Sequence, residues 1–470
     1  MNDLAPGSHI HLIAVCGVGM ASLAGLLQSR GYRVSGSDQN VYPPMSTYLA
    51  DIGIDVQSGY RAEHVEPRPD LVVIGNAISR GNPEAEAVIS QNLRYISFPQ
   101  ALGEFLIGAR TSIVIAGTHG KTTTSALAAW VLTSAGLDPG FFVGGVPLNF
   151  SSGWRVGAGS HVVLEGDEYD TAFFDKGPKF LHYRPNHAVL TSVEFDHADI
   201  YRDLDHVKSA FARLMEILPA AGKLVVCRDY PDAVEVSKSA RCELITYGDD
   251  GDWTAKEIEF RAGRTIFTPC YRGHGEGSME AGVIGRHNVK NALAVYAMGR
   301  ALSIPRQKLL EGFATFKGVK RRQEVRGEQR GVVVIDDFAH HPTAVRETID
   351  AVRSAYAGRR LWAIFEPRSN TSKRNIFEKE FAAALALADR VIVAGVFQPE
   401  KVPEAERLSV PHMVGEINRL AGAERAATLA GADDIAAHVA QDARSGDVLL
   451  VMSNGGFDGV HDKILRALAG

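Results

Sequence analysis

The stretch GTHGKTTT, residues 117–124, has the residue types and spacing that suit the binding of a phosphate group. Glycines let backbone N–H groups converge on phosphate oxygens, the Lys121 ammonium can neutralise them, and the Thr122 hydroxyl can bind Mg²⁺. An apolar run from Ile113 to Ala116 predicts a buried strand before the stretch, and a helix is predicted from Ser125 onward. The match to the common GxxxxGK[ST] pattern is imperfect, because Ile115 stands where the first glycine is expected.

Two acidic stretches follow later predicted strands and could complete a metal site. EGDEYD supplies Glu165, and EFDHAD supplies His197 together with several carboxylates. Mg²⁺ prefers oxygen ligands, so Glu165 is the natural ligand and histidine the less usual one. Either stretch alone is typical of a solvated loop. Because both follow a phosphate-binding loop at successive strand ends, they predict an active site.

The elements around these residues predict an α/β fold. Short β-branched runs alternate with Ala- and Leu-rich helical stretches, which is typical of mostly parallel sheets. Most predicted strands end in glycine, a carboxylate, histidine or asparagine, at the edge where open α/β sheets bind ligands. Composition shifts predict three domains at residues 1–108, 109–320 and 321–470. Antiparallel hairpins are expected within residues 250–282.

Composition and charge exclude several classes of protein. The 470 residues are 45% hydrophobic and 22% charged, and the formal net charge is −5. The absence of a basic stripe argues against a nucleic-acid partner. No apolar run is long enough for a membrane span, and the first residues lack a secretion signal. The four cysteines lack metal-ligand spacing, so a reduced, cytoplasmic protein is expected.

A glycine-containing turn near the N-terminus mimics a dinucleotide-binding fingerprint. CGVGMAS follows the first predicted strand, and Asp38 ends the second strand at the distance where a ribose-binding carboxylate is expected. The third glycine of the fingerprint is replaced by Ser22. An NAD-dependent oxidoreductase is therefore one alternative, although it leaves the loop at residues 117–124 unexplained.

Six motifs together resemble the Mur ligase family of peptidoglycan enzymes: GTHGKTTT, EGDEYD, EFDHAD, GRHNVKNALA, RRQE and DDFAHHPTAV. The resemblance runs from about residue 9 to residue 463. It implies a Rossmann-like UDP-binding domain, a central P-loop ATPase-type domain with a mostly parallel sheet, and a Rossmann-like C-terminal domain. It also implies an ATP-dependent carbon–nitrogen ligase that works through an acyl phosphate with ATP and Mg²⁺. EPRSNT and YPPMS favour the branch that joins L-alanyl-γ-D-glutamyl-meso-diaminopimelate to UDP-N-acetylmuramate in peptidoglycan recycling.

The resemblance assigns roles to individual residues. Lys121, Glu165, His197 and Arg322 are the expected catalytic residues, and Thr122, Glu165 and His197 the expected metal ligands. ATP would be bound by Gly117, Thr118, His119, Gly120, Lys121, Thr122, Thr123, His287, Asn288, Asn291, Arg322 and Asp337. The UDP-sugar would be bound by Gly17, Gly19, Met20, Ser37, Asp38 and Asn76. The peptide would be bound by His340, His341, Arg368, Ser369, Asn370, Ser453 and Asn454.

Several alternatives remain open at this level. The family member that adds L-alanine alone shares many of the same motifs. A nucleotide-dependent switch or binding protein would use the same phosphate loop, although the guanine-specifying NKxD motif is absent. Lys208 lies too early in its predicted helix for the carbamylated lysine that some Mur ligases use, so none is expected. A monomer or weak homodimer is expected, with no membrane partner.

Overall fold

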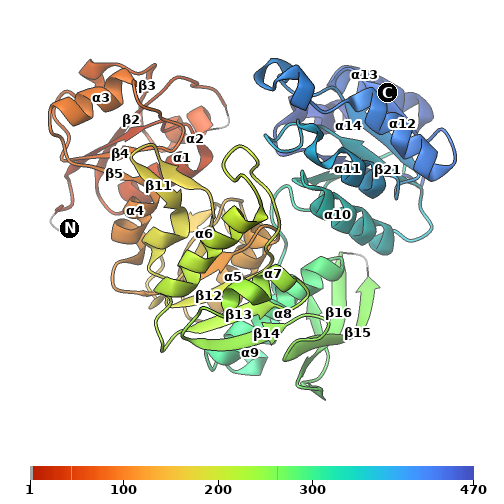
Figure 1. Ribbon diagram of the computed structural model, residues 1–470, viewed down its shortest axis with the longest axis horizontal. Coiled ribbons are helices and arrows are strands. Elements are labelled where there is room, and N and C mark those ends of the chain that lie inside the picture. The colour runs from red at the N-terminus through yellow and green to blue at the C-terminus, as the bar shows by residue number, and fades with distance from the viewer. Residues whose placement is uncertain (1–3, 44, 262) are drawn as a thin grey trace. The chain divides into compact units, whose positions relative to one another are not determined.

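The computed structural model describes residues 4–43, 45–261 and 263–470 (Figure 1). Pro44, within the YPPMS stretch, lies outside the described residues. The chain forms two compact units. Unit 1 comprises Met1–Glu194, Leu204–Trp253 and Ala294–Gly312, and unit 2 comprises Phe195–Asp203, Thr254–Leu293 and Phe313–Gly470. Within the described residues, no helix has the length and apolar character needed to cross a bilayer.

The first sheet of unit 1 has five parallel strands in the order β3-β2-β1-β4-β5. Its strands are β1 (His9–Ile13), β2 (Arg33–Asp38), β3 (Val56–Ser58), β4 (Leu71–Ile74) and β5 (Tyr95–Ser97). Its helices are α1 (Val18–Ser29), α2 (Met45–Asp51), α3 (Pro83–Ser90) and α4 (Phe98–Leu102). The strand order reverses at β1, so a switch point lies between the carboxyl ends of β1 and β4. Ligands bind at such switch points in open α/β sheets.

The second sheet of unit 1 contains the strands β14-β13-β12-β6-β9-β7-β8 in spatial order. They are β6 (Thr111–Ala116), β7 (Gly140–Phe142), β8 (Trp154–Arg155), β9 (His161–Gly166), β12 (His187–Leu190), β13 (Lys223–Cys227) and β14 (Glu243–Tyr247). All neighbours are parallel except β7 and β8. The accompanying elements are α5 (Lys121–Ser134), α6 (Leu204–Ile217), α7 (Pro231–Ser237) and the hairpin of β10 (Asp170–Ala172) and β11 (Asp175–Pro178).

Two helices contribute to both units. Helix α8 (Arg286–Ala301) begins in unit 2 and ends in unit 1, and α9 (Arg306–Thr315) begins in unit 1 and ends in unit 2. In unit 1, Val295 and Met298 of α8 pack with Ile113 and Ile115 of β6 around a small apolar cavity. Both strand residues are almost fully buried. The alternation of β-branched strand residues with apolar helix residues therefore produces the expected layered core.

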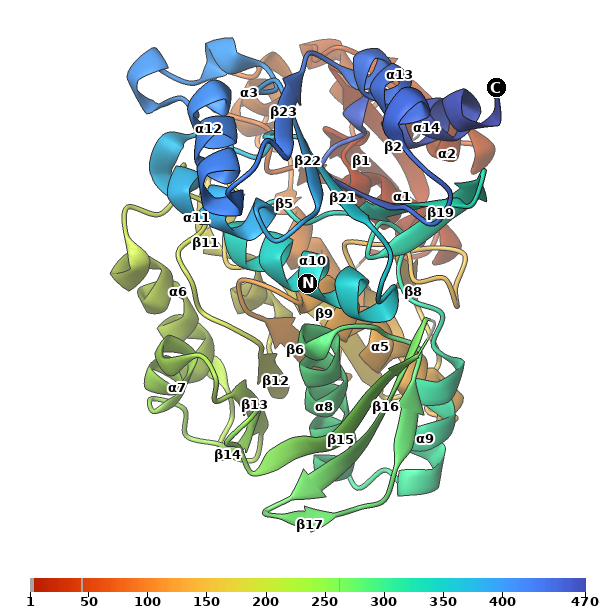
Figure 2. The ribbon, with the colours of Figure 1, turned by 90° about the vertical axis from the view of Figure 1, so that its right-hand side faces the viewer.

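Unit 2 contains an antiparallel region and a second α/β sheet. The strands of the first region are β15 (Trp253–Arg261), β16 (Arg264–Tyr271), β17 (His274–Gly275) and β18 (Met279–Ala281), and the first three are labelled in Figure 2. Strand β16 pairs antiparallel with β17 and with β18. The hairpins expected within residues 250–282 are therefore present. The other sheet has the order β19-β20-β24-β21-β22-β23, in which only β19 is antiparallel.

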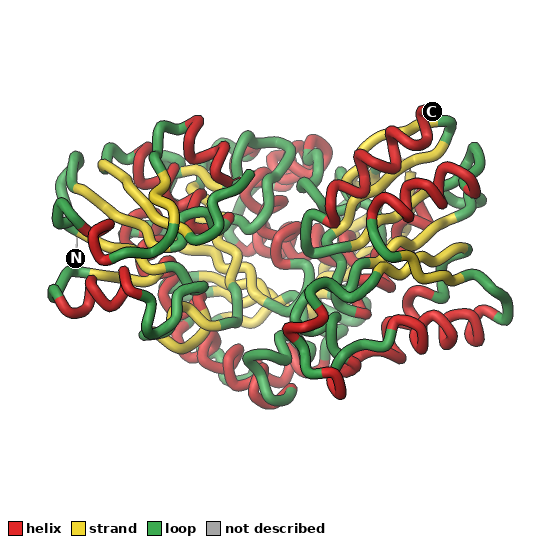
Figure 3. The backbone as a smooth tube through the Cα atoms, turned by 90° about the horizontal axis from the view of Figure 1, so that it is seen from above, coloured by secondary structure: helices red, strands yellow, loops and turns green. Residues whose placement is uncertain are grey.

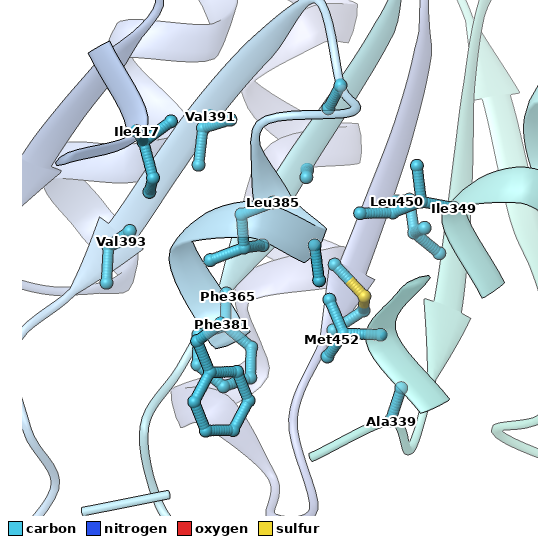
Figure 4. Close-up of a cluster of buried hydrophobic side chains, with 14 of the residues drawn as sticks. Ala339, Ile349, Phe365, Phe381, Leu385, Val391, Val393, Ile417, Leu450 and Met452 are labelled. Carbon is cyan, nitrogen blue, oxygen red and sulfur yellow. The ribbon is translucent and has the colours of Figure 1, made fainter. Parts of the chain in front are cut away.

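The strands of this sheet are β19 (Glu324–Gln329), β20 (Val332–Asp337), β21 (Leu361–Phe365), β22 (Arg390–Ala394), β23 (Ala426–Leu429) and β24 (Val448–Met452). Helices α10 (Pro342–Ala355), α11 (Glu378–Leu385) and α12 (Val410–Ala421) share a hydrophobic core with one face of the sheet. Figure 4 shows part of this core, including Phe365, Phe381 and Leu450. Helices α13 (Ala432–Asp442) and α14 (Val460–Ala469) pack on the other face, so strands lie between helices as Figure 3 shows.

Short helical turns complete the described elements. The 3₁₀ turns are Ala62–Val65, Lys179–Tyr183, Asn375–Phe377, Pro399–Lys401, Glu404–Glu406 and Phe457–Gly459, and Gly103–Ile107 is a π-helical turn. The first expected domain and much of the second each have a sheet of their own within unit 1, but residues 195–203, 254–293 and 313–320 of the second expected domain belong to unit 2. Contacts across residue 108 join them, such as the hydrogen bond from Trp154 Nε1 to the Tyr48 hydroxyl at 3.3 Å. The exact domain boundaries stay predictions.

Candidate active site

The predicted phosphate-binding loop lies between β6 and α5, at the carboxyl end of the second sheet. Gly117 has φ +133° and Gly120 has φ +80°, both in the region that favours glycine. A Cβ atom on Gly117 would lie 2.2 Å from Thr191 Oγ1. The chain after β12 supports this loop, since Thr118 N donates to Ser192 O at 3.0 Å. The sequence therefore needs glycine here for conformation and for close packing.

Lys121 points back into the loop and is paired with a carboxylate. Its Nζ donates to Gly117 O at 2.6 Å and to Glu168 Oε2 at 2.9 Å, and the Glu168 side chain is only 2% exposed. Burial favours the neutral amine, but Glu168 and Asp167 outweigh it and raise the pKa of Lys121. Lys121 therefore carries its positive charge at neutral pH and can exchange a carboxylate partner for a phosphate group.

Thr122 and Glu165 lie together, as the sequence predicts. Thr122 Oγ1 donates to Glu165 Oε1 at 2.7 Å, and Gly144 N donates to Glu165 Oε2 at 2.7 Å. Burial, together with the nearby negative charge of Asp167, raises the pKa of the Glu165 carboxyl. A hydroxyl beside a carboxylate in a negatively charged environment is an all-oxygen donor set, which fits a hard divalent cation such as Mg²⁺.

A second lysine completes this charged cluster and was missed by sequence reasoning. Lys179 Nζ lies 3.0 Å from Asp167 Oδ2 and 4.1 Å from the centre of the Tyr169 ring. Glu165 thus lies within the end of β9, and Asp167 and Glu168 follow the strand. Lys179 faces Asp167 and Lys121 faces Glu168, so neither of these two ion pairs involves Glu165. The signal that could have revealed Lys179 is weak, because a lysine after a short hairpin is normally exposed.

The candidate UDP-sugar residues gather at the switch point of the first sheet. Gly17 caps α1, Met20 is buried in it, and a Cβ on Gly19 would lie 3.4 Å from the Phe98 ring. Asp38 is also buried, and its Oδ2 accepts a hydrogen bond from Cys16 N at 2.9 Å. The Asp38 carboxylate therefore holds the glycine-containing loop in place. Asn76 is exposed just after β4.

The buried acid Glu84 contacts Ser37, next to Asp38 at the end of β2. Ser37 Oγ donates to Glu84 Oε1 at 2.7 Å, and the same oxygen lies 2.6 Å from His11 Nε2. His64 Nδ1 lies 3.1 Å from the other Glu84 oxygen. Burial opposes ionisation of Glu84, but these hydrogen bonds outweigh it and lower the pKa of the carboxyl. Sequence reasoning missed Glu84, because it is 73 positions from His11 and lies in an ordinary amphipathic helix.

In unit 2, the candidate adenine and ribose residues are connected through Gln323. Asn288 Nδ2 donates to Gln323 Oε1 at 3.2 Å, and Asn291 Nδ2 donates to Asn288 Oδ1 at 3.0 Å. Gln323 N donates to Asp337 Oδ2 at 2.8 Å. Burial and the charge of Lys290 lower the pKa of His287 to about 4, so its ring is neutral. Arg322, predicted to contact ATP phosphate, lies with its guanidinium 4.7 Å from the centre of the Phe338 ring.

His197 and the HHP motif surround Asp196. Thr371 Oγ1 donates to Asp196 Oδ1 at 2.8 Å, and His197 N donates to the same oxygen at 2.7 Å. Burial raises the pKa of Asp196, but the electrostatic influence of the neighbouring histidine rings and the hydrogen bond from His197 N outweigh it and hold the pKa far below its usual range. His197 has φ +53°, an uncommon conformation that is frequent at functional sites.

His340 and His341 differ in how many of their ring nitrogens have hydrogen-bond partners. His341 caps α10, because Thr343 N donates to its Nδ1 at 3.4 Å, and its Nε2 lies 3.2 Å from Phe195 O. Both ring nitrogens of His341 are thus engaged. The Nδ1 atom of His340 lies 3.0 Å from Phe338 O and acts as the donor, which leaves Nε2 with its lone pair. Burial lowers the pKa of His340, so this ring is neutral and able to accept a proton.

The candidate peptide residues lie at the carboxyl ends of β21 and β24. Ser453 Oγ donates to Glu366 Oε2 at 2.5 Å, and Arg368 Nη1 lies 3.5 Å from Glu366 Oε1. The Arg368 guanidinium stacks 3.7 Å from the centre of the Phe397 ring. Glu366, only 6% exposed, is a further polar member of this group that sequence reasoning missed. Its position directly after a buried strand was the available signal.

The other candidate peptide residues are ordered by local contacts. Ser369 Oγ donates to Ser372 Oγ at 2.8 Å, and Asn370 Nδ2 donates to Asp199 Oδ2 at 2.9 Å. Within the part of the chain that the structure describes, Asn454 Oδ1 is buried without a hydrogen-bond partner. An acceptor of this kind is costly to bury unless a donor reaches it in some state of the protein. Asn454 is therefore a reasonable contact for an ammonium or amide group.

Three models of one protein family match successive parts of the chain. Residues 9–110 match the model "Mur ligase family, catalytic domain", residues 115–299 match "Mur ligase middle domain", and residues 321–455 match "Mur ligase, glutamate ligase domain". The UDP-N-acetylmuramate–L-alanyl-gamma-D-glutamyl-meso-2,6-diaminoheptandioate ligase of Escherichia coli is 41% identical over 472 residues, covering 98% of each chain. The UDP-N-acetylmuramate–L-alanine ligase of Syntrophotalea carbinolica is 33% identical and covers 95% of each chain.

A solved structure is similar over the whole length. The murein peptide ligase of Psychrobacter arcticus has a TM-score of 0.72 at 36% identity, covering 99% of each chain. The three family models and these full-length relatives agree with one another, and the fold is the three-domain, mostly parallel α/β fold expected from the sequence. The chain belongs to the Mur ligase family and is an ATP-dependent ligase.

Proposed function

We propose that this protein joins the tripeptide L-alanyl-γ-D-glutamyl-meso-diaminopimelate to UDP-N-acetylmuramate, at the expense of ATP, in peptidoglycan recycling. The geometry that carries the proposal is the phosphate loop, in which Lys121 is held 2.9 Å from Glu168 and Thr122 is held 2.7 Å from Glu165. The choice of substrates is supported by the relative that is 41% identical over 98% of both chains and whose name states this reaction.

The first step activates the carboxylate of the sugar. A carboxylate is a poor electrophile at neutral pH, and transfer of the γ-phosphoryl group from ATP converts it into an acyl phosphate with a good leaving group. Lys121 would move from Glu168 to the β and γ phosphates of ATP, and Arg322 would contact phosphate as well. Thr122, Glu165 and His197 would hold Mg²⁺, which supplies charge neutralisation at the transferring group. Residues of this kind accelerate the step by positioning and by charge stabilisation.

The second step forms the amide. The free amine of the peptide attacks the acyl carbon, a tetrahedral intermediate collapses, and phosphate leaves. The amine must lose a proton during this attack, and the neutral His340 offers its Nε2 atom for that role. Arg368 would pair with a peptide carboxylate, and Glu366 and Asn454 offer acceptors for the ammonium of diaminopimelate.

The nucleotides would be held by residues that the sequence singled out. His287, Asn288, Asn291 and Asp337 would bind the adenosine part of ATP. Gly17, Gly19, Met20, Ser37, Asp38 and Asn76 would bind the UDP part of the sugar substrate, where the N-terminal end of α1 presents backbone N–H groups to the diphosphate. The role of Asp38 is to fix the loop through Cys16 N.

An amine-substrate panel tests the proposal. Purified protein is incubated with ATP, Mg²⁺ and UDP-N-acetylmuramate, together with either the tripeptide or L-alanine. The mass of the UDP-sugar product is then measured by mass spectrometry. We expect a product whose mass corresponds to addition of the tripeptide, formed at least tenfold faster than any alanine adduct. Turnover of alanine without turnover of the tripeptide would establish the alternative activity carried by relatives such as the Syntrophotalea carbinolica enzyme. Slow ATP hydrolysis with no amide product would indicate a nucleotide-dependent switch.

A further inference from the structure

Residues Arg321–Glu324, here called the RRQE turn, have an unusual backbone in unit 2. Arg321 has φ +60° and Gln323 has φ +52°, conformations that non-glycine residues seldom adopt. Val319 and Arg322 form an isolated β-bridge around the turn, and Arg321 N donates to Glu324 Oε2 at 2.8 Å. Surrounding contacts thus fix the turn in one conformation, and such over-determined backbone is common where side chains must be aimed accurately.

One side of the RRQE turn faces the candidate adenosine residues. Gln323 accepts a hydrogen bond from Asn288 at 3.2 Å through its side chain and lies 3.4 Å from His287 Nε2. Its backbone N–H donates to Asp337 at 2.8 Å. A single glutamine therefore contacts three residues that are proposed to hold the nucleoside.

The other side of the turn faces the candidate peptide loop. Arg321 Nη2 donates to Ser453 O at 2.7 Å and to Gly455 O at 2.6 Å. The two carbonyls flank Asn454, whose buried Oδ1 atom has no hydrogen-bond partner among the described residues. The arginine thus fixes the backbone on both sides of a side chain that is available to a ligand.

We propose that Arg321 is a positioning residue that holds the loop of residues 453–455 in its peptide-binding conformation and couples it to nucleotide occupancy through the RRQE turn. This inference rests on the proposed function, since it assigns that loop to the peptide substrate. When ATP orders the adenosine residues, it also restrains Gln323. Arg321 is two positions before Gln323 in the same turn, so its hydrogen bonds to the loop of residues 453–455 are restrained as well. The result is a peptide site that is best formed when ATP is bound.

The surroundings of Arg321 suit this task. Its Nε atom lies 3.4 Å from Asp336 Oδ2, and its guanidinium lies 5.2 Å from the centre of the Phe338 ring. A planar guanidinium directs several N–H groups in a fixed fork, so one side chain can reach two carbonyls while remaining anchored by a carboxylate. A lysine keeps the charge but has a single nitrogen and no fork, so it cannot reproduce the whole set of contacts.

The test compares Arg321→Gln with Arg326→Gln. Both arginine side chains are 32% exposed and both lie within 3.5 Å of Asp336, but Arg326 donates hydrogen bonds to Asp336 and Asp462, whereas Arg321 donates to the loop. We expect Arg321→Gln to raise the KM for the tripeptide roughly tenfold, because two charge-assisted hydrogen bonds are lost. Arg326→Gln should leave this KM within about twofold. Arg321→Lys should recover part of the loss.

A partial reaction separates positioning from general damage. Acyl phosphate formation without tripeptide is followed by positional isotope exchange in ¹⁸O-labelled ATP, and we expect Arg321→Gln to keep this rate within about twofold of the wild type. Failure of the wild type to form the tripeptide adduct would reject the proposed function itself. Unchanged tripeptide KM in Arg321→Gln, or equal losses in the isotope exchange and in the KM, would reject the inference while leaving the ligase activity standing.

A measurement on the wild type covers the case in which Arg321→Gln does not fold. Hydrogen exchange of the amides at residues 453–457 is recorded with and without the β,γ-imido analogue of ATP and Mg²⁺. We expect the analogue to slow exchange in this loop several-fold in the wild type and in Arg326→Gln, and to a smaller extent in Arg321→Lys. Equal exchange in the wild type with and without the analogue would contradict the coupling.

Discussion

Lys121 has a carboxylate partner before any nucleotide arrives. Its ammonium lies against Glu168 and Gly117 O, so the phosphate loop is neutralised internally. Binding of ATP replaces the carboxylate with phosphate, and the net gain is the difference between two charge pairs. A buried lysine that keeps its charge needs a partner at every stage, and Glu168 is that partner before ATP binds.

His287 permits a prediction about stability at the residue scale. Its folded pKa of about 4 lies below the ordinary value of 6.5, so between these values the unfolded chain binds more protons than the folded one. The stability that it contributes is full above pH 6.5 and is lost as the pH falls towards 4. The lowering of the His287 pKa limits the loss in the free energy of unfolding to about 3 kcal/mol.

The check is the free energy of unfolding by urea at several pH values. We expect His287→Gln to have a shallower decline than the wild type between pH 6.5 and pH 4. His274→Gln serves as the control, because the His274 side chain is exposed on β17. A His287→Gln variant with the same pH slope as the wild type would show that the ring binds its proton as readily in the folded protein as in the unfolded chain.

At the scale of elements, the strands and the motif loops were predictable and many of their tertiary partners were not. β6 and α5 follow directly from the apolar run and the glycines around residue 117. Strand β12 ends at Leu190, although Thr191 N still donates to Ala116 O, and the Thr191 hydroxyl donates to His119 O in the phosphate loop. Patterns of apolar residues give the element but not the side-chain hydrogen bonds made at its end.

The candidate site shows the same division. The residues of the phosphate loop and Glu165 could be predicted, because they stand at fixed distances from glycines and strand ends. Glu84, Gln323 and Glu366 act through partners that are distant in sequence, such as His11 at 73 positions and Ser453 at 87 positions. Without tertiary structure, a buried acid of this kind has the same local pattern as an exposed one.

The phosphate loop permits a prediction at the scale of the element. Gly117→Ala places a methyl group 2.2 Å from Thr191 Oγ1 and 2.8 Å from Ser192 N, at φ +133°. We expect the loop to shift, ATP binding to weaken at least tenfold, and the melting temperature to fall. The matched control is Gly136→Ala after α5, where φ is +81° but nothing lies within 4 Å of the added atom.

The control variant, Gly136→Ala, has backbone strain from its positive φ but no steric clash of the added methyl group. We expect it to cost about 1 kcal/mol of stability and to leave ATP affinity unchanged. ATP binding is measured by calorimetry and melting by fluorescence. Equal ATP affinities of the two variants would show that the close packing of Gly117 against the chain after β12 is unimportant for the loop.

At the scale of the whole molecule, residues 321–470 have the features of an independent domain. They contain all six strands of their sheet and hydrophobic cores on both of its faces. We expect this fragment, expressed alone, to unfold in a single cooperative transition, which circular dichroism during heating measures. A fragment of residues 350–470 lacks β19, β20 and most of α10, and should not fold cooperatively. A gradual transition in the longer fragment would move the predicted boundary away from residue 320.

The chain passes several times between the two units, and this has a consequence for recombination between related genes. The chain leaves one unit for the other after Glu194, Asp203, Trp253, Leu293 and Gly312, and α8 changes unit in mid-helix. A single genetic crossover between residues 195 and 312 therefore combines parts of both units from different parents. Chimeras of related genes joined there must reconcile two cores at once, whereas a junction between α9 and β19 exchanges the C-terminal sheet together with the helices on both of its faces, so we expect it to yield working hybrids more often.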